Sequence, residues 1–385
     1  MRRAGLAACL AFGAAACSND GDIVGPPPGN QAFSPEAVAN SIFSLRFAGD
    51  NAVVVQVGTI SSALGLSASR TAGSSDRLSL SVARASRAKP ARGQVDRLSL
   101  LRTFPPRGLQ DLVANRAAAA ARGQSVPLFP INFLGKTFVF DAGIDAYVEL
   151  GDGGPANGVR FELYVVDLES GLPALPLSPV GFVDLIDLSD AVSTRLRVRA
   201  FDTQGGGQTP LADYVVDGAF SSTSTGVAVS LLSEGFAIDQ NGRFDFDLDE
   251  LLESDDAAGL TAVSSVHRVV SDEGTDVRLE VEGDIANDGS HSDLFFRMDI
   301  DGSAGLTLVD LAVVDGDQNG DIRHNGTLEV IVGGTVESPT FAAAAGPPFS
   351  ISERAALDEI LFGIDDVLFF ASELFIPLAD LFGVG

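Results

Sequence analysis

Residues 243–248, Arg-Phe-Asp-Phe-Asp-Leu, alternate charged and apolar side chains with a period of two. Successive side chains of a β-strand point to opposite faces, so this pattern predicts a strand with one buried and one hydrated face. The same alternation returns in ten further segments. These are residues 136–141, 144–149, 159–165, 195–201, 212–216, 227–232, 277–282, 294–300, 306–313 and 327–332. We therefore expect a mainly β protein.

Short turn sequences separate these segments, for example Asn287-Asp-Gly289 and Asp301-Gly302. Long helical patterns are missing between them, which favours an antiparallel meander over a parallel sheet. Eleven strands are more than one flat sheet usually holds, so residues 126–340 are expected to form a curved sheet, an open barrel or a sandwich. Two local predictions are a hairpin that turns at Ala142-Gly143 and a further strand at residues 52–57.

Residues 341–385 are expected to form a C-terminal amphipathic helix that packs on the β domain. Ser350 and Glu353 have the spacing of a capping box, and apolar or small side chains then recur at helical spacing from residue 357 to residue 382. The opposite face is acidic, with Asp358, Glu359, Asp365, Asp366, Glu373 and Asp380. Pro377 should kink or end the helix. The functional alternatives are a lid over an apolar cavity and a docking helix for a partner.

Residues 34–125 are expected to form a mixed, partly disordered and arginine-rich region with short helices. Ser34 and Pro35 have the composition of a helix start, and a second helix is expected at residues 107–122. Residues 70–122 hold 11 Lys and Arg against 3 Asp and Glu. This excess is interpreted as a solvated segment that offsets the acidic domain, and the alternative is a patch for acidic partners or lipid head groups.

Composition excludes several classes of function. The formal net charge is −27, and residues 123–385 hold 45 Asp and Glu against 11 Lys and Arg, so the chain should repel nucleic acid. Cys9 and Cys17 are the two cysteines, and both lie near the N-terminus. Disulfide bonds within the mature chain and zinc sites built from thiolates are therefore not expected.

Residues 1–20, MRRAGLAACLAFGAAACSND, have two arginines, a short apolar run and small residues before Cys17. The run is too short to span a bilayer and has the order of a cleaved export signal. The segment resembles the signal peptides of bacterial lipoproteins. That resemblance implies a signal peptide at 1–16, lipid on Cys17 and a flexible tether at 17–33, with Ser18 compatible with sorting to the outer membrane. Ala14-Ala15-Ala16 also fits an ordinary A-x-A cleavage site.

Residues 315–322, Asp-Gly-Asp-Gln-Asn-Gly-Asp-Ile, match the first eight positions of an EF-hand-like calcium loop. Oxygen ligands at alternating positions would come from Asp315, Asp317, Asn319 and Asp321. Position twelve is Gly326 instead of the bidentate Glu, so a plain Asp/Asn/Gly turn is the alternative. Residues 239–245 are a weaker relative of this pattern. The sequence thus predicts bound Ca²⁺ as a candidate cofactor.

Catalytic motifs are not evident. The three histidines, His267, His291 and His324, lack a metal-binding spacing, and neither GxSxG nor a P-loop is present. We expect an outer-membrane-anchored envelope lipoprotein with a non-enzymatic binding or structural role, whose partners are the membrane and a protein or an apolar ligand. One alternative is a carrier of an apolar ligand or lipid in a cavity between the curved sheet and the helix. The third candidate is a hydrolase, which needs a histidine and a carboxylate that meet in a cleft.

Overall fold

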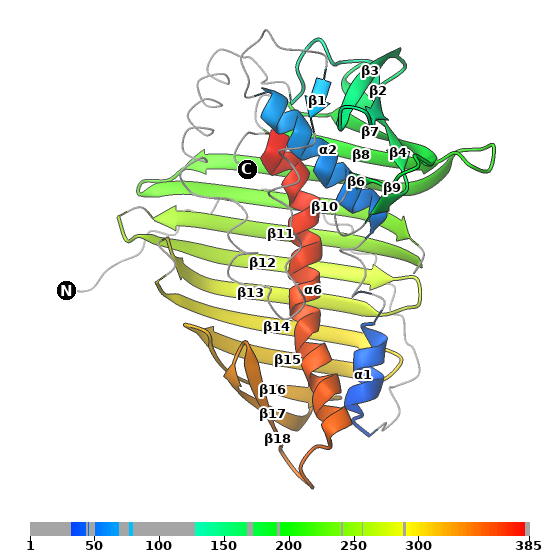
Figure 1. Ribbon diagram of the computed structural model, residues 1–385. Coiled ribbons are helices and arrows are strands. Elements are labelled where there is room, and N and C mark those ends of the chain that lie inside the picture. The colour runs from blue at the N-terminus through cyan, green and yellow to red at the C-terminus, as the bar shows by residue number, and fades with distance from the viewer. Residues whose placement is uncertain are drawn as a thin grey trace, which may run out of the picture.

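One large curved sheet dominates the protein, as a computed structural model shows (Figure 1). The structure describes residues 32–43, 45, 51–68, 77–79, 128–167, 172–190, 193–239, 242–255, 257–287 and 290–381. Sixteen strands form the sheet in the order β1-β3-β2-β4-β7-β8, and then from β9 to β18 in sequence order. The sheet is open, with β1 and β18 at its two edges, so the curved sheet is the form adopted among the three that were expected.

The strands run as follows: β1 Arg77–Ser79, β2 Lys136–Asp141, β3 Ala146–Asp152, β4 Gly158–Tyr164, β5 Val166–Asp167, β6 Leu172–Pro173, β7 Pro179–Asp187, β8 Thr194–Asp202, β9 Thr209–Ser222, β10 Gly226–Asp239, β11 Gly242–Asp255, β12 Leu260–Ser271, β13 Asp276–Ala286, β14 Ser292–Gly302, β15 Gly305–Val314, β16 Asp317–His324, β17 Thr327–Thr335 and β18 Ser338–Ala343. From β7 onward each strand pairs antiparallel with the next, which confirms the meander. β2 and β4 form a parallel pair, so the sheet is mixed. β5 and β6 pair in a small separate sheet.

Sequence alternation sets which face of each strand is buried. In β11, Phe244, Phe246 and Leu248 are buried, and the acidic residues between them face outward. Two-residue turns fix the register of the last hairpins. Asp315-Gly316 and Asn325-Gly326 both have positive φ at each residue, as a type I′ turn requires.

The first hairpin differs from its prediction by the length of its turn. Asp141 pairs with Ala146, so the turn holds residues 142–145 and not only Ala142-Gly143. Asp141 Oδ1 accepts a hydrogen bond from the Gly143 N–H at 2.8 Å, and Asp145 adopts a φ of 51°. This side-chain bond lets a longer turn close, and Ile144, which was assigned to the strand, belongs to the turn.

The prediction of a strand at residues 52–57 is wrong, because these residues begin helix α2 (Ala52–Ala68). Asn51 Oδ1 accepts hydrogen bonds from the N–H groups of Val53 and Val54, at 3.0 and 3.2 Å, and so caps the helix. Buried side chains recur at helical spacing: Val53, Val54, Val57, Ile60 and Leu64. Burial against the rest of the fold thus overrides the strand preference of a valine run.

Helices α1 (Pro35–Ser41) and α6 (Ile351–Leu381) begin with the predicted caps. Ser34 Oγ accepts a hydrogen bond from the Ala37 N–H. Ser350 and Glu353 form the reciprocal capping box, with bonds of 2.7 and 3.2 Å. α6 continues beyond Pro377 to Leu381, so the proline does not end it.

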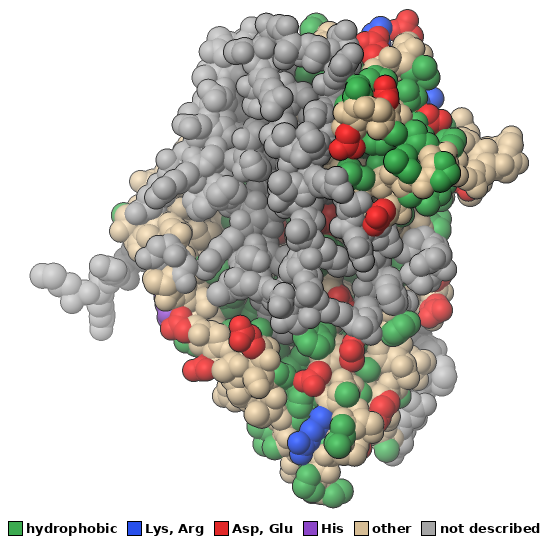
Figure 2. Space-filling model, in the orientation of Figure 1, with side chains coloured by type: hydrophobic (Ala, Val, Ile, Leu, Met, Phe, Trp, Pro, Cys, Tyr) green, Lys and Arg blue, Asp and Glu red, His purple; other side chains and the backbone are tan. Residues whose placement is uncertain are grey.

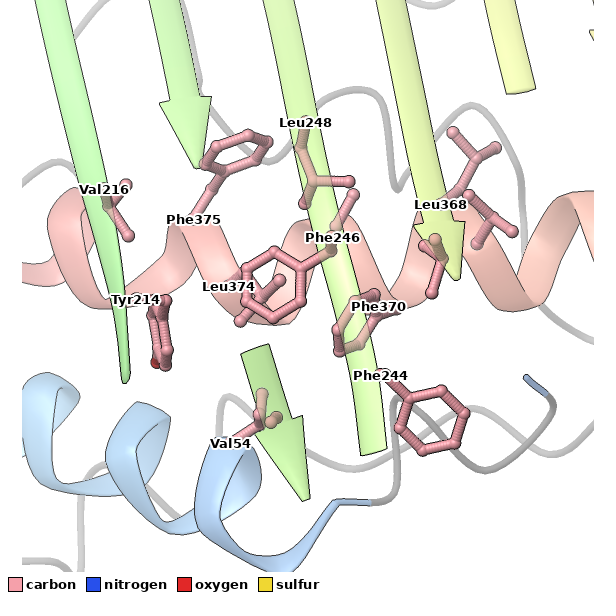
Figure 3. Packing of buried hydrophobic residues seen from close by; sticks show 14 of the residues in the cluster. Val54, Tyr214, Val216, Phe244, Phe246, Leu248, Leu368, Phe370, Leu374 and Phe375 are labelled. Atoms are coloured by element: carbon pink, nitrogen blue, oxygen red, sulfur yellow. The ribbon is translucent and has the colours of Figure 1, made fainter. Parts of the chain in front are cut away.

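α6 crosses the strands on the inner, concave face of the sheet, with α1 beside its first half and α2 beside its second half (Figure 1). Figure 3 shows Phe246 of β11 and Phe370 of α6 pointing toward each other between the two layers. The predicted packing of the C-terminal helix on the sheet is confirmed. The acidic side of α6 is more enclosed than an outward face would be: Asp365 is buried, and Asp358, Glu359, Asp366 and Glu373 are half-buried.

Candidate functional sites

Four buried polar side chains lie close together on the apolar inner face of the sheet. Ser233 of β10, Glu250 of β11, and Ser265 and His267 of β12 are all buried, and we call them the inner polar cluster. Ser233 and His267 are the cross-strand neighbours of Leu248 on its two sides. Glu250 lies directly across from Ser265, two positions further along both strands. The register therefore brings an acid, an imidazole and two hydroxyl groups to one patch.

These side chains are poorly partnered. Both hydroxyl oxygens and both ring nitrogens of His267 lack a hydrogen-bond partner within the described part of the chain. Burial raises the pKa of Glu250 to about 7 and lowers the pKa of His267 to about 4. Burial disfavours the charged form of each group. Between about pH 4 and pH 7, Glu250 is therefore mainly a neutral acid and His267 mainly a neutral base.

The cluster follows from a change in the pattern of β11. The period of two that begins at residue 243 puts Glu250 on the apolar face and Leu251, which is 37% exposed, on the wet face. Sequence reasoning missed the site because it ended this strand at Leu248. Continuing the alternation to Glu250 would have revealed a carboxyl group on the buried side, a departure typical of functional or strained positions.

A groove of about 300 Å³ lies between α1 and the first half of α6. Ala39, Ile42, Ala355 and Ala356 contribute apolar surface to it, and its carboxylates are Glu36, Glu359 and Asp366. A Cβ at Gly363 would lie 2.9 Å from Ile42 Cδ1, so this glycine allows α1 to pack closely on α6. Figure 2 shows acidic side chains over this lower part of the molecule. The groove therefore combines apolar surface with negative charge.

The residues of the predicted calcium site lie on a hairpin. Asp315 is in the two-residue turn, where its Oδ1 accepts a hydrogen bond from the Ser292 N–H. Asp317, Asn319 and Asp321 alternate along β16, and Asp321 forms an ion pair with Arg323. Asp317 and Asp321 are four positions apart on an extended strand, about 13 Å, which is too far for both carboxylates to place an oxygen at about 2.3–2.6 Å from one Ca²⁺. The path is thus not the coiled loop that the pattern indicated, and calcium binding stays a prediction.

The weaker relative at residues 239–245 is also a hairpin. β10 ends at Asp239 and β11 begins at Gly242. Asp245 forms an ion pair with Arg243 on the outer face. Among the residues that the structure describes, no group of three or more His, Cys, Asp or Glu side chains is placed to hold a metal ion.

The three histidines lie apart in the sheet. His291 Nδ1 is 2.8 Å from Asp315 Oδ1, and both side chains are about half exposed at the end of a hairpin. The Ser292 N–H and His291 together lower the pKa of Asp315. His324 is buried and lies 3.0 Å from Thr307 Oγ1, and His267 belongs to the inner polar cluster. A histidine and a carboxylate therefore do meet, at His291 and Asp315, on an exposed turn.

The outer face of the sheet carries a series of ion pairs. Most join neighbouring strands, and three lie within one strand, at Arg243–Asp245, Arg278–Glu280 and Arg323–Asp321. Ten of the 11 basic residues after residue 122 take part, and Arg354 of α6 is the eleventh. These ten are Lys136, Arg160, Arg195, Arg197, Arg199, Arg243, Arg268, Arg278, Arg297 and Arg323. Each exposed pair contributes only about 0–1 kcal/mol to the stability of the fold. The main effect of the pairs is to neutralise part of the negative charge on this face. Carboxylates outnumber these cations about fourfold in this part of the chain, so the outer face stays acidic.

Cys17, the signal peptide at 1–16 and the expected helix at 107–122 lie outside the described residues. Across the described ranges, no helix is both long and apolar enough to cross a membrane. Comparison with protein-family models, with curated proteins and with solved structures found no match for this chain.

Proposed function

We propose that this chain is an exported envelope lipoprotein, anchored at the outer membrane through lipid on Cys17, whose β domain has a non-enzymatic binding or structural role. The observation that carries the role of the domain is the burial of the inner face of the sheet under α1, α2 and α6. A face filled by the chain's own side chains supports a packed module rather than an open reaction chamber.

The distribution of candidate catalytic groups also favours this role. His267 and Glu250 are enclosed in the core, and His291 and Asp315 meet on an exposed turn. An active site usually combines such a pair with a concave pocket that excludes water. The hydrolase is therefore the weakest of the three candidates.

The carrier is the second candidate, and the groove between α1 and α6 is the observation that favours it. Its volume of about 300 Å³ is at the lower end of the range for small-molecule sites, which runs from about 300 to 1,000 Å³. The carboxylates on its lining would select an apolar molecule that carries a positive charge, and not an anionic lipid.

Membrane fractionation tests the anchor. The parent protein should sediment with the outer membrane, and Cys17→Ser should release it into the soluble fraction of the envelope. Cys17→Ala is a second variant without a thiol, and Cys9→Ser is the matched control that should stay anchored. A Cys17→Ser protein that stays in the membrane fraction contradicts the lipid assignment.

Native mass spectrometry of the protein purified from its own host tests the role of the domain. A mass that matches the protein alone supports the structural or protein-binding role. A co-purified apolar mass that is lost in Ala39→Trp, a variant that fills the groove, would move the assignment to a carrier. The conservative variant Ala39→Ser should keep that mass.

A further inference from the structure

β18 is an edge strand with little protection. It pairs with β17 on one side, and within the described residues no strand pairs with its other side. Natural proteins usually block such edges with charged side chains, bulges or covering segments. Here residues 338–352 contain no charged side chain, although the chain carries a net charge of −27. Pro339 is the one edge-blocking residue within the strand, and prolines in sheets are found mainly on edge strands.

The hydrogen-bond pattern shows which backbone groups of β18 face the open edge. The Ala344 N–H donates to the Glu329 carbonyl of β17, so residue 344 points toward the sheet. In an antiparallel pair the backbone N–H and C=O groups of successive residues point alternately toward the partner strand and away from it. The backbone groups of Ala342 and Thr340 therefore also point toward β17. Five backbone groups therefore point away from β17, toward the open edge. They are the N–H groups of Phe341 and Ala343 and the carbonyl groups of Pro339, Phe341 and Ala343.

We propose that β18 is a dimerisation edge, on which a second copy of this chain adds its own β18 antiparallel to form one continuous sheet. In this arrangement a two-fold axis passes between the two Phe341 residues. Each Phe341 N–H donates to the carbonyl of Phe341 in the other copy. Each Ala343 N–H donates to the carbonyl of Pro339 in the other copy. Proline lacks an N–H, but it acts here as the acceptor, so this bond can form.

Self-pairing fits the side chains and the charges of this edge. Phe341 is only partly buried against the core, and the two-fold axis would place two such rings side by side on the same face. Thr340 would lie opposite Ala342 of the other copy, and both are exposed and uncharged. Because the strand has no charged side chain, two strongly acidic copies can pair there without placing carboxylates opposite each other. The addition of a strand to a sheet edge is an established mode of protein association.

Sedimentation velocity over a range of protein concentrations tests the proposal, in a mild detergent that keeps the N-terminal segment soluble. The parent protein should show a monomer–dimer equilibrium that shifts toward dimer as salt rises, because salt screens the repulsion between acidic copies. Ala343→Pro removes an outward N–H and places a ring at the edge, so it should weaken the dimer at least about tenfold. Ala343→Ser keeps the N–H and should remain dimeric.

A second variant guards against a proline that prevents folding. Thr340→Asp with Ala342→Asp would place like charges opposite each other at two points of the dimer, and should leave the monomer folded because both positions are exposed. Ala312→Asp, on an exposed position of inner strand β15, is the matched control and should dimerise normally. A parent protein that is monomeric at every concentration, or a dimer that survives both edge variants, overturns the proposal.

Discussion

Phe246 of β11 and Phe370 of α6 meet edge to face, with ring centroids 5.3 Å apart and ring planes at 82°. Both rings are buried, and Phe246 also contacts Tyr214 of β9 at 5.7 Å. The contact joins the two layers of the fold directly, because one ring comes from the centre of the sheet and the other from the C-terminal helix. It therefore reports on whether α6 is seated on the sheet.

Phe370→Ala should lower the free energy of unfolding by roughly 3–5 kcal/mol, since it removes a buried aromatic ring and leaves a cavity. Urea denaturation followed by far-UV circular dichroism measures this change. Phe369→Ala is the matched control at the preceding position of α6, where the side chain is only half-buried, and it should lower the free energy of unfolding clearly less. Equal losses for the two variants would show that α6 is not packed in this orientation.

Asn51→Ala should destabilise the protein by about 0.5–2 kcal/mol, because the first N–H groups of α2 lose the side chain that caps them. Asn51→Ser keeps a hydrogen-bonding oxygen and should recover most of the loss. Thermal unfolding of the two variants and the parent measures both effects. Indistinguishable melting temperatures for Asn51→Ala and the parent would contradict the cap.

Glu250 and His267 should give opposite contributions to stability as pH changes. The pKa of Glu250 is raised from 4.5 to about 7, so its stabilising contribution is complete below pH 4.5 and is lost as pH rises to about 7. The pKa of His267 is lowered from 6.5 to about 4, so its contribution grows as pH rises from about 4 to 6.5. Each shift corresponds to about 3 kcal/mol, and the two contributions should largely cancel between pH 4.5 and 6.5.

Single variants of this pair separate the two contributions. Glu250→Gln should gain stability relative to the parent as pH rises from 4.5 to 7, because a neutral amide replaces a buried acid that must ionise. His267→Gln should gain stability relative to the parent as pH falls from 6.5 to 4. Urea denaturation at closely spaced pH values measures both differences. Two difference curves that are flat, or that slope in the same direction, would refute the opposed titrations.

Calcium binding at Asp315, Asp317, Asn319 and Asp321 predicts a higher melting temperature in calcium than in a chelator. Asp317→Asn should remove that rise, since it takes away a central carboxylate of the proposed site. Asp299→Asn is the control, because Asp299 lies on the outer face of β14 outside the site. If calcium leaves the melting temperature of the parent protein unchanged, Asp315 and Gly316 are only a turn.

The sequence predicted those features that depend on local pattern. Alternation between residues 136 and 332 located eleven of the strands and missed β7, β12 and β16, and the Ser350–Glu353 capping box locates the start of α6. Asp315-Gly316 and Asn325-Gly326 have the residue types of type I′ turns; the first was predicted only as the alternative to a calcium loop, and the second was not predicted. These signals are local because a side chain's face or a cap depends on residues only a few positions away.

Features that depend on distant contacts were not predictable in the same way. The valines at residues 53–55 form a helix because Asn51 caps it and the fold buries its side chains, and a six-residue apolar run does not distinguish the two outcomes. The inner polar cluster arises where β10, β11 and β12 align, so its members are up to 34 positions apart. The register of a large sheet has to be known before such residues can be grouped.

The order of elements along the chain has a consequence for biosynthesis. From β7 to β18, each strand finds its partner in the strand made just before it, so the sheet can extend one hairpin at a time as the chain emerges. α6, which packs across the inner face, is made after all the strands of the sheet. Until residues 351–381 are available, the nascent sheet presents its phenylalanines and leucines without this cover. A nascent chain that has made β18 but not yet α6 should thus be the form most in need of a chaperone.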